Sequence, residues 1–139
     1  MKHSFDKNEY IIRLYKGEEV VKTLEQFFEQ QSIHSGKISG IGAVCDVNLG
    51  FYDQEKKQYN SQLFRDDFEI VNFTGNISLR DGNPFLHAHI AIGDSSFRVF
   101  GGHLFSAIVS VTGEFSLTTF SKPIHRVQDE ETGLKLLEL

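Results

Sequence analysis

Three histidines in the second half of the sequence have types and spacing that suit a metal site. His87 and His89 alternate with apolar residues across residues 86–92, which predicts a strand with both imidazoles on the same face. Two positions along a strand are about 6.6 Å apart, and both rings can converge on one ion across that gap. The pair therefore predicts part of a metal site.

His103 is the third histidine, and a predicted turn brings it back toward the other two. With the turn centred near Ser95, His103 would lie opposite Leu86 or His87, where cross-strand neighbours are about 5 Å apart. The two glycines directly before it carry no side chains, so another group can approach this strand closely. We therefore predict that the three histidines form one site.

The predicted ion is Zn²⁺ or another divalent transition metal. Three protein ligands leave a fourth position open for water or a substrate, and zinc-bound water ionises near neutral pH, as hydrolases and lyases require. The alternative interpretation is a structural metal or a hydrogen-bonded histidine cluster, because a buried histidine is usually hydrogen bonded. The remaining histidines, His3, His34 and His125, are expected at the N-terminus, at the end of a helix and in a loop.

Two carboxylates in apolar surroundings are the candidate catalytic groups. Glu69 lies between Phe68 and Ile70, and Glu114 lies inside a long apolar stretch. Either is a candidate fourth ligand or general base, and the alternative interpretation is a charge at a strand edge or a subunit interface. The single cysteine, Cys45, is predicted to be a small buried hydrophobe, because no basic residue flanks it to stabilise a thiolate.

These residues need a sheet to position them, and the apolar pattern predicts one main helix and about seven strands. Residues 18–31 have apolar side chains at helical spacing, with glutamates and glutamines on the opposite face. The glycine-rich stretch 37–52 predicts a long strand with a bulge or bend. The remaining strands are predicted over residues 10–14, 58–64, 68–79, 85–92, 97–100 and 104–120. Short turns between them predict an α+β domain with a mainly antiparallel sheet, and the C-terminal leucines are expected to pack on its core.

Length and composition limit the class of protein. With 139 residues, of which 40% are hydrophobic and 24% are charged, the chain is predicted to fold as a single domain over residues 1–139. Its net charge of -5 disfavours non-specific DNA binding by one subunit. A single cysteine, a charged N-terminus and no apolar stretch of membrane-spanning length predict a cytoplasmic protein that does not bind membranes.

Five short motifs occur in an order that is typical of one family. They are Gly40-Ile41-Gly42-Ala43-Val44, Phe68-Glu69-Ile70, Thr74-Gly75-Asn76-Ile77-Ser78, His87-Ala88-His89 and Gly101-Gly102-His103-Leu104. With this combination, the chain resembles the PPC (plants and prokaryotes conserved) domain over nearly its whole length. The resemblance implies an α+β fold with helices packed on a mainly antiparallel sheet, and assembly into homotrimers.

The resemblance also implies functions. Plant members follow a DNA-binding AT-hook and mediate self-association and contact with transcription factors, whereas prokaryotic members are usually this domain alone and are often described as DNA-binding. Some prokaryotic members look like zinc proteins, with histidines that match His87, His89 and His103. The plant interaction motif Gly-Arg-Phe-Glu-Ile falls on residues 66–70, where two aspartates replace its Gly-Arg. The sequence contains no Arg-Gly-Arg-Pro run of the AT-hook kind.

Two functional hypotheses follow. The first is a homotrimeric binding module with a zinc site, associated with DNA or with transcription-related proteins. The second is a metal-dependent hydrolase or lyase that acts on a small molecule at the three histidines, with Glu69 or Glu114 as general base. The first follows from the resemblance, and the second rests on the open fourth position of a three-histidine site.

Overall fold

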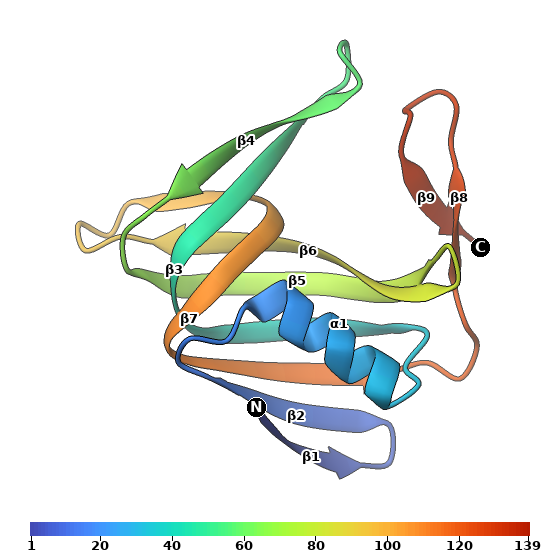
Figure 1. Ribbon diagram of the computed structural model, residues 1–139, viewed down its shortest axis with the longest axis horizontal. Coiled ribbons are helices and arrows are strands. Elements are labelled where there is room, and N and C mark those ends of the chain that lie inside the picture. The colour runs from blue at the N-terminus through green and yellow to red at the C-terminus, as the bar shows by residue number, and fades with distance from the viewer.

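One helix and nine strands form the structure, a computed structural model that describes all residues 1–139 (Figure 1). The helix is α1 (Val20–Gln30), and the strands are β1 (Lys2–Asp6), β2 (Glu9–Tyr15), β3 (Gly36–Asp53), β4 (Gln58–Phe64), β5 (Phe68–Arg80), β6 (Asn83–Gly93), β7 (Val99–Thr119), β8 (His125–Gln128) and β9 (Lys135–Glu138). They join in one sheet in the order β1-β2-β7-β3-β5-β8-β9, with β4 paired to β3 and β6 paired to both β5 and β7. Only the short contact between β5 and β8 is parallel. The predicted α+β class with a mainly antiparallel sheet is therefore confirmed.

The helix α1 forms because its apolar residues fall on one face and its N-terminus is capped. The Glu19 carboxylate accepts hydrogen bonds from the backbone N–H groups of Val21 and Lys22, which have no partner within the helix. The helix contacts β6 and β7 and lies in front of the sheet in the view of Figure 1. Its buried side chains are Val20, Leu24, Phe27 and Phe28. The helix predicted over residues 18–31 is confirmed, although it begins two residues later and ends one residue earlier than predicted. Neither its length nor its hydropathy meets what a membrane-spanning helix needs.

The core is one cluster of 25 buried residues, and the largest of its fully buried side chains are phenylalanines. Phe73 of β5 and Phe115 of β7 are fully buried and meet edge to face, with ring centroids 5.0 Å apart. From β6, the side chains of Leu86, Ala88 and Ile90 are buried in the same core. Because side chains alternate along a strand, the histidines between them point to the opposite face. The core therefore fixes the direction of the histidines.

The two longest strands, β3 and β7, differ in how well the sequence predicts them. The pairing of β3 with β5 shifts between Gly40 and Gly42, which is the predicted bulge. The sequence predicts a break near residues 101–103, but β7 continues through it because Gly101 and Gly102 keep their pairing with β6. A Cβ atom at Gly102 would lie 2.7 Å from a backbone oxygen of β3, so glycine is required for this close approach.

Three strands that the sequence pattern does not indicate, β1, β8 and β9, bring the total to nine rather than about seven. The strand pairing of the β8–β9 hairpin with β5 consists of one position, Leu79 with His125, so His125 lies in a strand rather than a loop. Because the hairpin projects from the sheet, the expected packing of the C-terminal leucines is wrong. Leu136 and Leu137 are 40% and 37% exposed, and Leu139 is fully exposed.

Candidate metal centre

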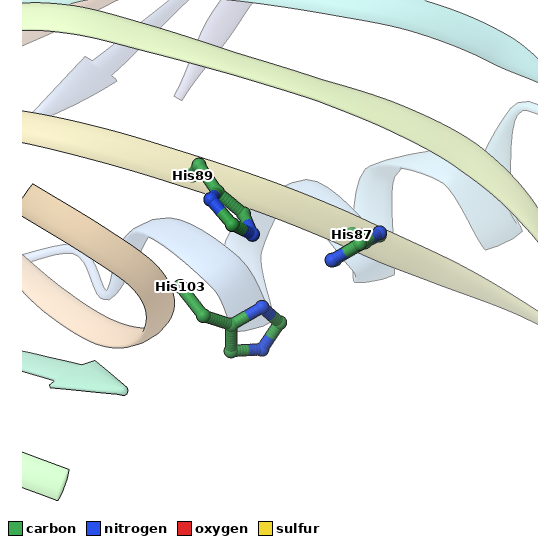
Figure 2. A group of neighbouring side chains, drawn as sticks. All are labelled: His87, His89 and His103. Carbon is green, nitrogen blue, oxygen red and sulfur yellow. The ribbon is translucent and has the colours of Figure 1, made fainter. Parts of the chain in front are cut away.

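The three predicted histidines come together on the sheet. His87 and His89 extend from one face of β6, and His103 extends toward them from β7 (Figure 2). Each residue offers one ring nitrogen, and the three nitrogens lie within 4.8 Å of one another. The ring centroids of the three pairs are 5.4, 5.2 and 5.6 Å apart. Three imidazoles from neighbouring strands thus face one point.

The register of β6 against β7 differs from the predicted one. His103 lies directly opposite His89, not opposite Leu86 or His87. A displacement of two positions along a strand keeps a side chain on the same face. The three rings therefore converge although the predicted partner of His103 is wrong.

The turn between β6 and β7 explains this difference. Its carboxylate side chain, Asp94, accepts hydrogen bonds from the backbone N–H groups of Ser96 and Arg98. Phe97 has a positive φ of 61°, a left-handed conformation that spacing alone does not reveal in a non-glycine residue. The turn is consequently centred at Ser96, one residue later than the sequence predicts.

His87 and His103 are half-buried, and loss of solvation is the main cause of their low pKa values. The pKa of His87 is lowered to about 4 by burial and by the nearby charges of Arg126 and His89. The pKa of His103 is lowered to about 4 by burial and by the two other histidines. Both rings are therefore neutral at pH 7, and each keeps one nitrogen lone pair that a metal can use.

One ring nitrogen in this group has no partner. The Nδ1 atom of His103 is buried without a hydrogen bond, and such a group costs about 1–3 kcal/mol when left unsatisfied. Tyr59 and Phe105 pack against the His103 ring, with centroids 5.0 and 4.9 Å away, and restrict its orientation. Neutral imidazoles with an unpartnered nitrogen are a donor set that fits a divalent transition metal.

A cavity of about 650 Å³ opens beside the cluster and is lined by His87 and His103. Helix α1 contributes Val21 and Glu25 to its wall, and the hairpin of β8 and β9 contributes Arg126 among others. Figure 1 shows this hairpin standing beside the turn that joins β5 and β6. The volume is typical of small-molecule sites. The geometry therefore gives a ligand access to the histidines.

Arg126 is a further site residue that no pattern in the sequence indicates. Its Nη2 atom lies 3.3 Å from the Nδ1 atom of His87. The residue belongs to β8, whose strand pairing with the main part of the sheet is one position on β5. Neither periodicity nor motif spacing connects positions 126 and 87, so only the folded structure reveals the contact.

The two candidate catalytic carboxylates do not lie beside the three histidines in the structure. Neither Glu69 nor Glu114 lines the histidine cavity. Glu69 lines a separate, mainly apolar groove of about 770 Å³ together with Cys45. Glu114 is exposed and accepts a hydrogen bond from the Thr112 hydroxyl. Burial and the nearby Asp46 charge raise the pKa of the Cys45 thiol, which keeps this side chain protonated.

The fold and site define an α+β protein with a three-histidine cluster on its sheet. One protein family matches most of this chain. The model of the Plants and Prokaryotes Conserved (PCC) domain matches residues 1–121. The chain therefore belongs to this family, which is the PPC family indicated by its motifs. The hairpin of β8 and β9, with Arg126, lies beyond the matched residues.

Solved structures from two organisms are similar over nearly the whole chain. A protein of Bacteroides thetaiotaomicron, described as a candidate DNA-binding protein, is 36% identical with a TM-score of 0.95, over 99% of this chain and 96% of that chain. A protein of Archaeoglobus fulgidus, described as metal-containing, is 39% identical with a TM-score of 0.89, over 100% of both chains.

A curated relative contains a similar segment within a much longer protein. The Bifunctional protein GlmU of Synechococcus sp. (strain JA-3-3Ab) is 29% identical over 127 residues. The alignment covers 89% of this chain but only 19% of that protein. The similarity is thus confined to one part of the longer relative.

Proposed function

We propose that the protein is a homotrimeric binding module of the PCC family whose three-histidine site holds one divalent transition metal, with zinc as the expected ion. The observation that carries the metal site is the convergence of three ring nitrogens within 4.8 Å. His87, His89 and His103 would hold the ion. A metal bound there would supply Lewis acidity at its open coordination position.

Zinc is favoured by the chemistry of the donor set. Three imidazoles without a thiolate form a ligand set typical of zinc sites that keep a fourth position open. The metal-containing relative from A. fulgidus, which is 39% identical, supports metal binding in general. Copper, nickel and iron also bind imidazole, so the test identifies the ion as well as counting it.

Elemental analysis of the dialysed protein, purified without added metal, tests the site. We expect about one zinc ion per chain, held by three protein ligands. His87→Ala and His103→Ala should each remove the metal while the circular dichroism spectrum is retained. His125→Ala is the matched control, because this histidine lies in β8 outside the cluster. A wild-type protein that contains neither zinc, copper, nickel nor iron contradicts the proposal.

Exposed apolar side chains support self-association into the homotrimer that the family resemblance implies. Phe97, Val99 and Val111 are 92%, 57% and 68% exposed, and they line the apolar groove that contains Glu69. Monomeric proteins rarely expose large contiguous apolar patches. A second copy of the chain seated on this groove would remove these side chains from water.

DNA is the partner that the B. thetaiotaomicron relative supports, because that protein is described as a candidate DNA-binding protein. The net charge of -5 works against direct binding of phosphates by this chain. We expect no electrophoretic shift of duplex DNA at physiological salt. A shift that persists there and weakens as salt increases would establish phosphate contacts and with them a DNA-binding role.

The cavity beside the histidines favours a second candidate function, a metal-dependent hydrolase or lyase. A small molecule in this cavity of about 650 Å³ would have access to the open position of the ion. A screen of small esters, phosphate esters and hydroxy acids tests this candidate. Turnover that disappears in His103→Ala supports it, whereas turnover that is unchanged in the metal-free variant contradicts it.

A further inference from the structure

Arg126 is a fixed cation with no acidic partner. Its Nε atom donates to the Ser78 hydroxyl at 2.8 Å, Nη1 donates to the backbone carbonyl of Lys135 at 2.9 Å, and Nη2 donates to Asn76 Oδ1 at 2.8 Å. None of the four salt bridges in the structure includes this residue. Neutral acceptors thus hold the guanidinium in place on the cavity wall while its charge stays uncompensated.

The same guanidinium engages a proposed metal ligand. Because a guanidinium only donates hydrogen bonds, the Nδ1 atom of His87, 3.3 Å from Arg126 Nη2, must accept with its lone pair. A neutral imidazole has one such lone pair, and its other nitrogen carries the proton. A metal bound to Nδ1 of His87 uses this lone pair. A metal bound to Nε2 leaves the proton on Nδ1, which then cannot accept a hydrogen bond. Metal binding by His87 and the hydrogen bond from Arg126 therefore exclude each other.

Metal binding would consequently leave Arg126 with unused donors beside the cavity. A guanidinium has five N–H groups. Three of those on Arg126 donate to Ser78, Lys135 and Asn76, and these contacts keep the group where it is. With the hydrogen bond to His87 lost, the two remaining N–H groups need an acceptor, and an anion supplies the strongest kind.

A second cation without an acidic partner lines the same cavity. The Arg80 guanidinium lies over the Phe85 ring, 3.9 Å from its centroid, and forms no salt bridge. Arg126 lies 5.3 Å from the centroid of the same ring. One aromatic side chain thus contacts both guanidinium groups, and stacking of this kind restricts an arginine without neutralising it.

The carboxylates of the cavity have other partners. Asp81 forms a salt bridge with the Lys135 ammonium at 2.6 Å, and Glu25 accepts a hydrogen bond from the backbone N–H of Leu86 at 3.0 Å. The chain as a whole carries a net charge of -5. Two neighbouring arginines without carboxylate partners, in a cavity of an acidic protein, form a site typical of carboxylate and phosphate recognition.

We propose that this cavity binds a small organic oxyanion, a carboxylate or a phosphate monoester with an apolar body, through Arg80 and Arg126, and that anion and metal binding are coupled through the contact of Arg126 with His87. Phe85 and Leu104 are among the apolar side chains that would contact the body of the ligand. The coupling rests on the proposed metal function, whereas the anion site does not. By linkage, each ligand increases the affinity for the other by the same factor.

Calorimetric titration of benzoate and of phenyl phosphate into metal-free and zinc-loaded protein tests this proposal, and the two probes distinguish a carboxylate from a phosphate. We expect at least one probe to bind about 5- to 150-fold more tightly to the zinc-loaded protein, the usual range for coupled sites. Zinc should bind more tightly by the same factor when that probe is saturating. Benzamide has the same body as benzoate without its charge, and equal affinity for benzamide overturns the anion site.

An anion that ligates the zinc directly would also prefer the loaded protein, and two variants separate these cases. Arg126→Met should strengthen zinc binding in the absence of anion, because the His87 lone pair is free, and should abolish the coupling factor. A merely structural Arg126 would weaken zinc binding instead. Arg80→Met should weaken probe binding to both forms by about tenfold or more and leave the coupling factor unchanged. Arg65→Met, at an exposed position outside the cavity, is the control.

A measurement on the wild-type protein covers the case in which Arg126→Met misfolds. Nitrogen-15 shifts of the metal-free protein report which ring nitrogen of His87 carries the proton, and we expect Nε2. A proton on Nδ1, or a coupling factor that survives in Arg126→Met, overturns the coupling. Unchanged probe affinity in Arg80→Met overturns the anion site. If no metal binds, the proposed function fails and the coupling with it, while an Arg80-dependent affinity for benzoate still supports the anion site.

Discussion

At the scale of single residues, the site depends on histidines that remain neutral. Burial makes protonation of His87 and His103 unfavourable, so both rings keep a lone pair at pH 7. The same burial leaves the Nδ1 atom of His103 without a hydrogen bond. This unpartnered nitrogen lowers the stability of the protein without metal, and a cation bound at the proposed site would remove that cost.

The burial of these two histidines predicts how the stability of the metal-free protein varies with pH. The pKa values of His87 and His103 are about 4 in the folded protein, against 6.5 for an unperturbed histidine. Between these values the unfolded chain binds more protons than the folded chain, so the free energy of unfolding increases with pH. We expect the contribution to be complete above pH 6.5 and to be lost as pH falls toward 4. Urea unfolding of the metal-free protein across this range measures it.

A double variant isolates the contribution of the two histidines. In His87→Gln/His103→Gln neither position titrates, so the free energy of unfolding should depend less steeply on pH between 4 and 6.5. His34→Gln, at an exposed position outside the cluster, should keep the wild-type slope. If the double variant has the wild-type slope, the low pKa values do not describe the folded protein.

At the scale of elements, one carboxylate fastens helix α1 to the sheet. Glu19 caps the helix by accepting from the N–H of Val21, and the same oxygen accepts from the N–H of Ala107 in β7 at 3.1 Å. The capping group thus satisfies donors of two elements. Since Val21 also lines the histidine cavity, this contact sets where the helix wall stands relative to the site.

Removal of this cap should be measurable in unfolding experiments. We expect Glu19→Ala to lower the free energy of unfolding by about 1–2 kcal/mol, because it leaves helix donors without their acceptor. Glu19→Gln should lose less, since an amide oxygen can still accept. Glu29→Ala, an exposed glutamate in the last turn of the same helix, is the control and should change little. Equal effects of Glu19→Ala and Glu29→Ala would argue against the capping role.

The elements also show what a sequence can and cannot predict. Local patterns were sufficient for α1, for the bulge in β3 and for the common face of His87 and His89, because alternation and glycine placement are visible within a few residues. The predicted cross-strand partner of His103 was wrong. A turn closed by Asp94, with Phe97 in a left-handed conformation, changes the register of β6 against β7. The position of Arg126 depends on a long-range strand contact, for which the chain carries no local signal.

At the scale of the whole molecule, ligand binding and self-association are proposed for different surfaces. The histidine cavity, with Arg80 and Arg126, and the apolar groove, with Phe97 and Val111, have no residue in common. The first gathers cationic groups and the proposed metal ligands, and the second gathers exposed apolar side chains. Each proposed function can therefore be removed without touching the residues of the other.

The apolar groove gives the prediction for the assembly. We expect light scattering to give the mass of a trimer for the wild-type protein and a smaller mass for Phe97→Asp and Val111→Asp, because burial of a carboxylate in an apolar interface is costly. Phe51→Asp is the control, since Phe51 is 74% exposed but lies outside the groove. A wild-type monomer, or a trimer that both substitutions leave intact, would contradict this interface. Zinc content should persist in the smaller species, because the three histidines come from one chain.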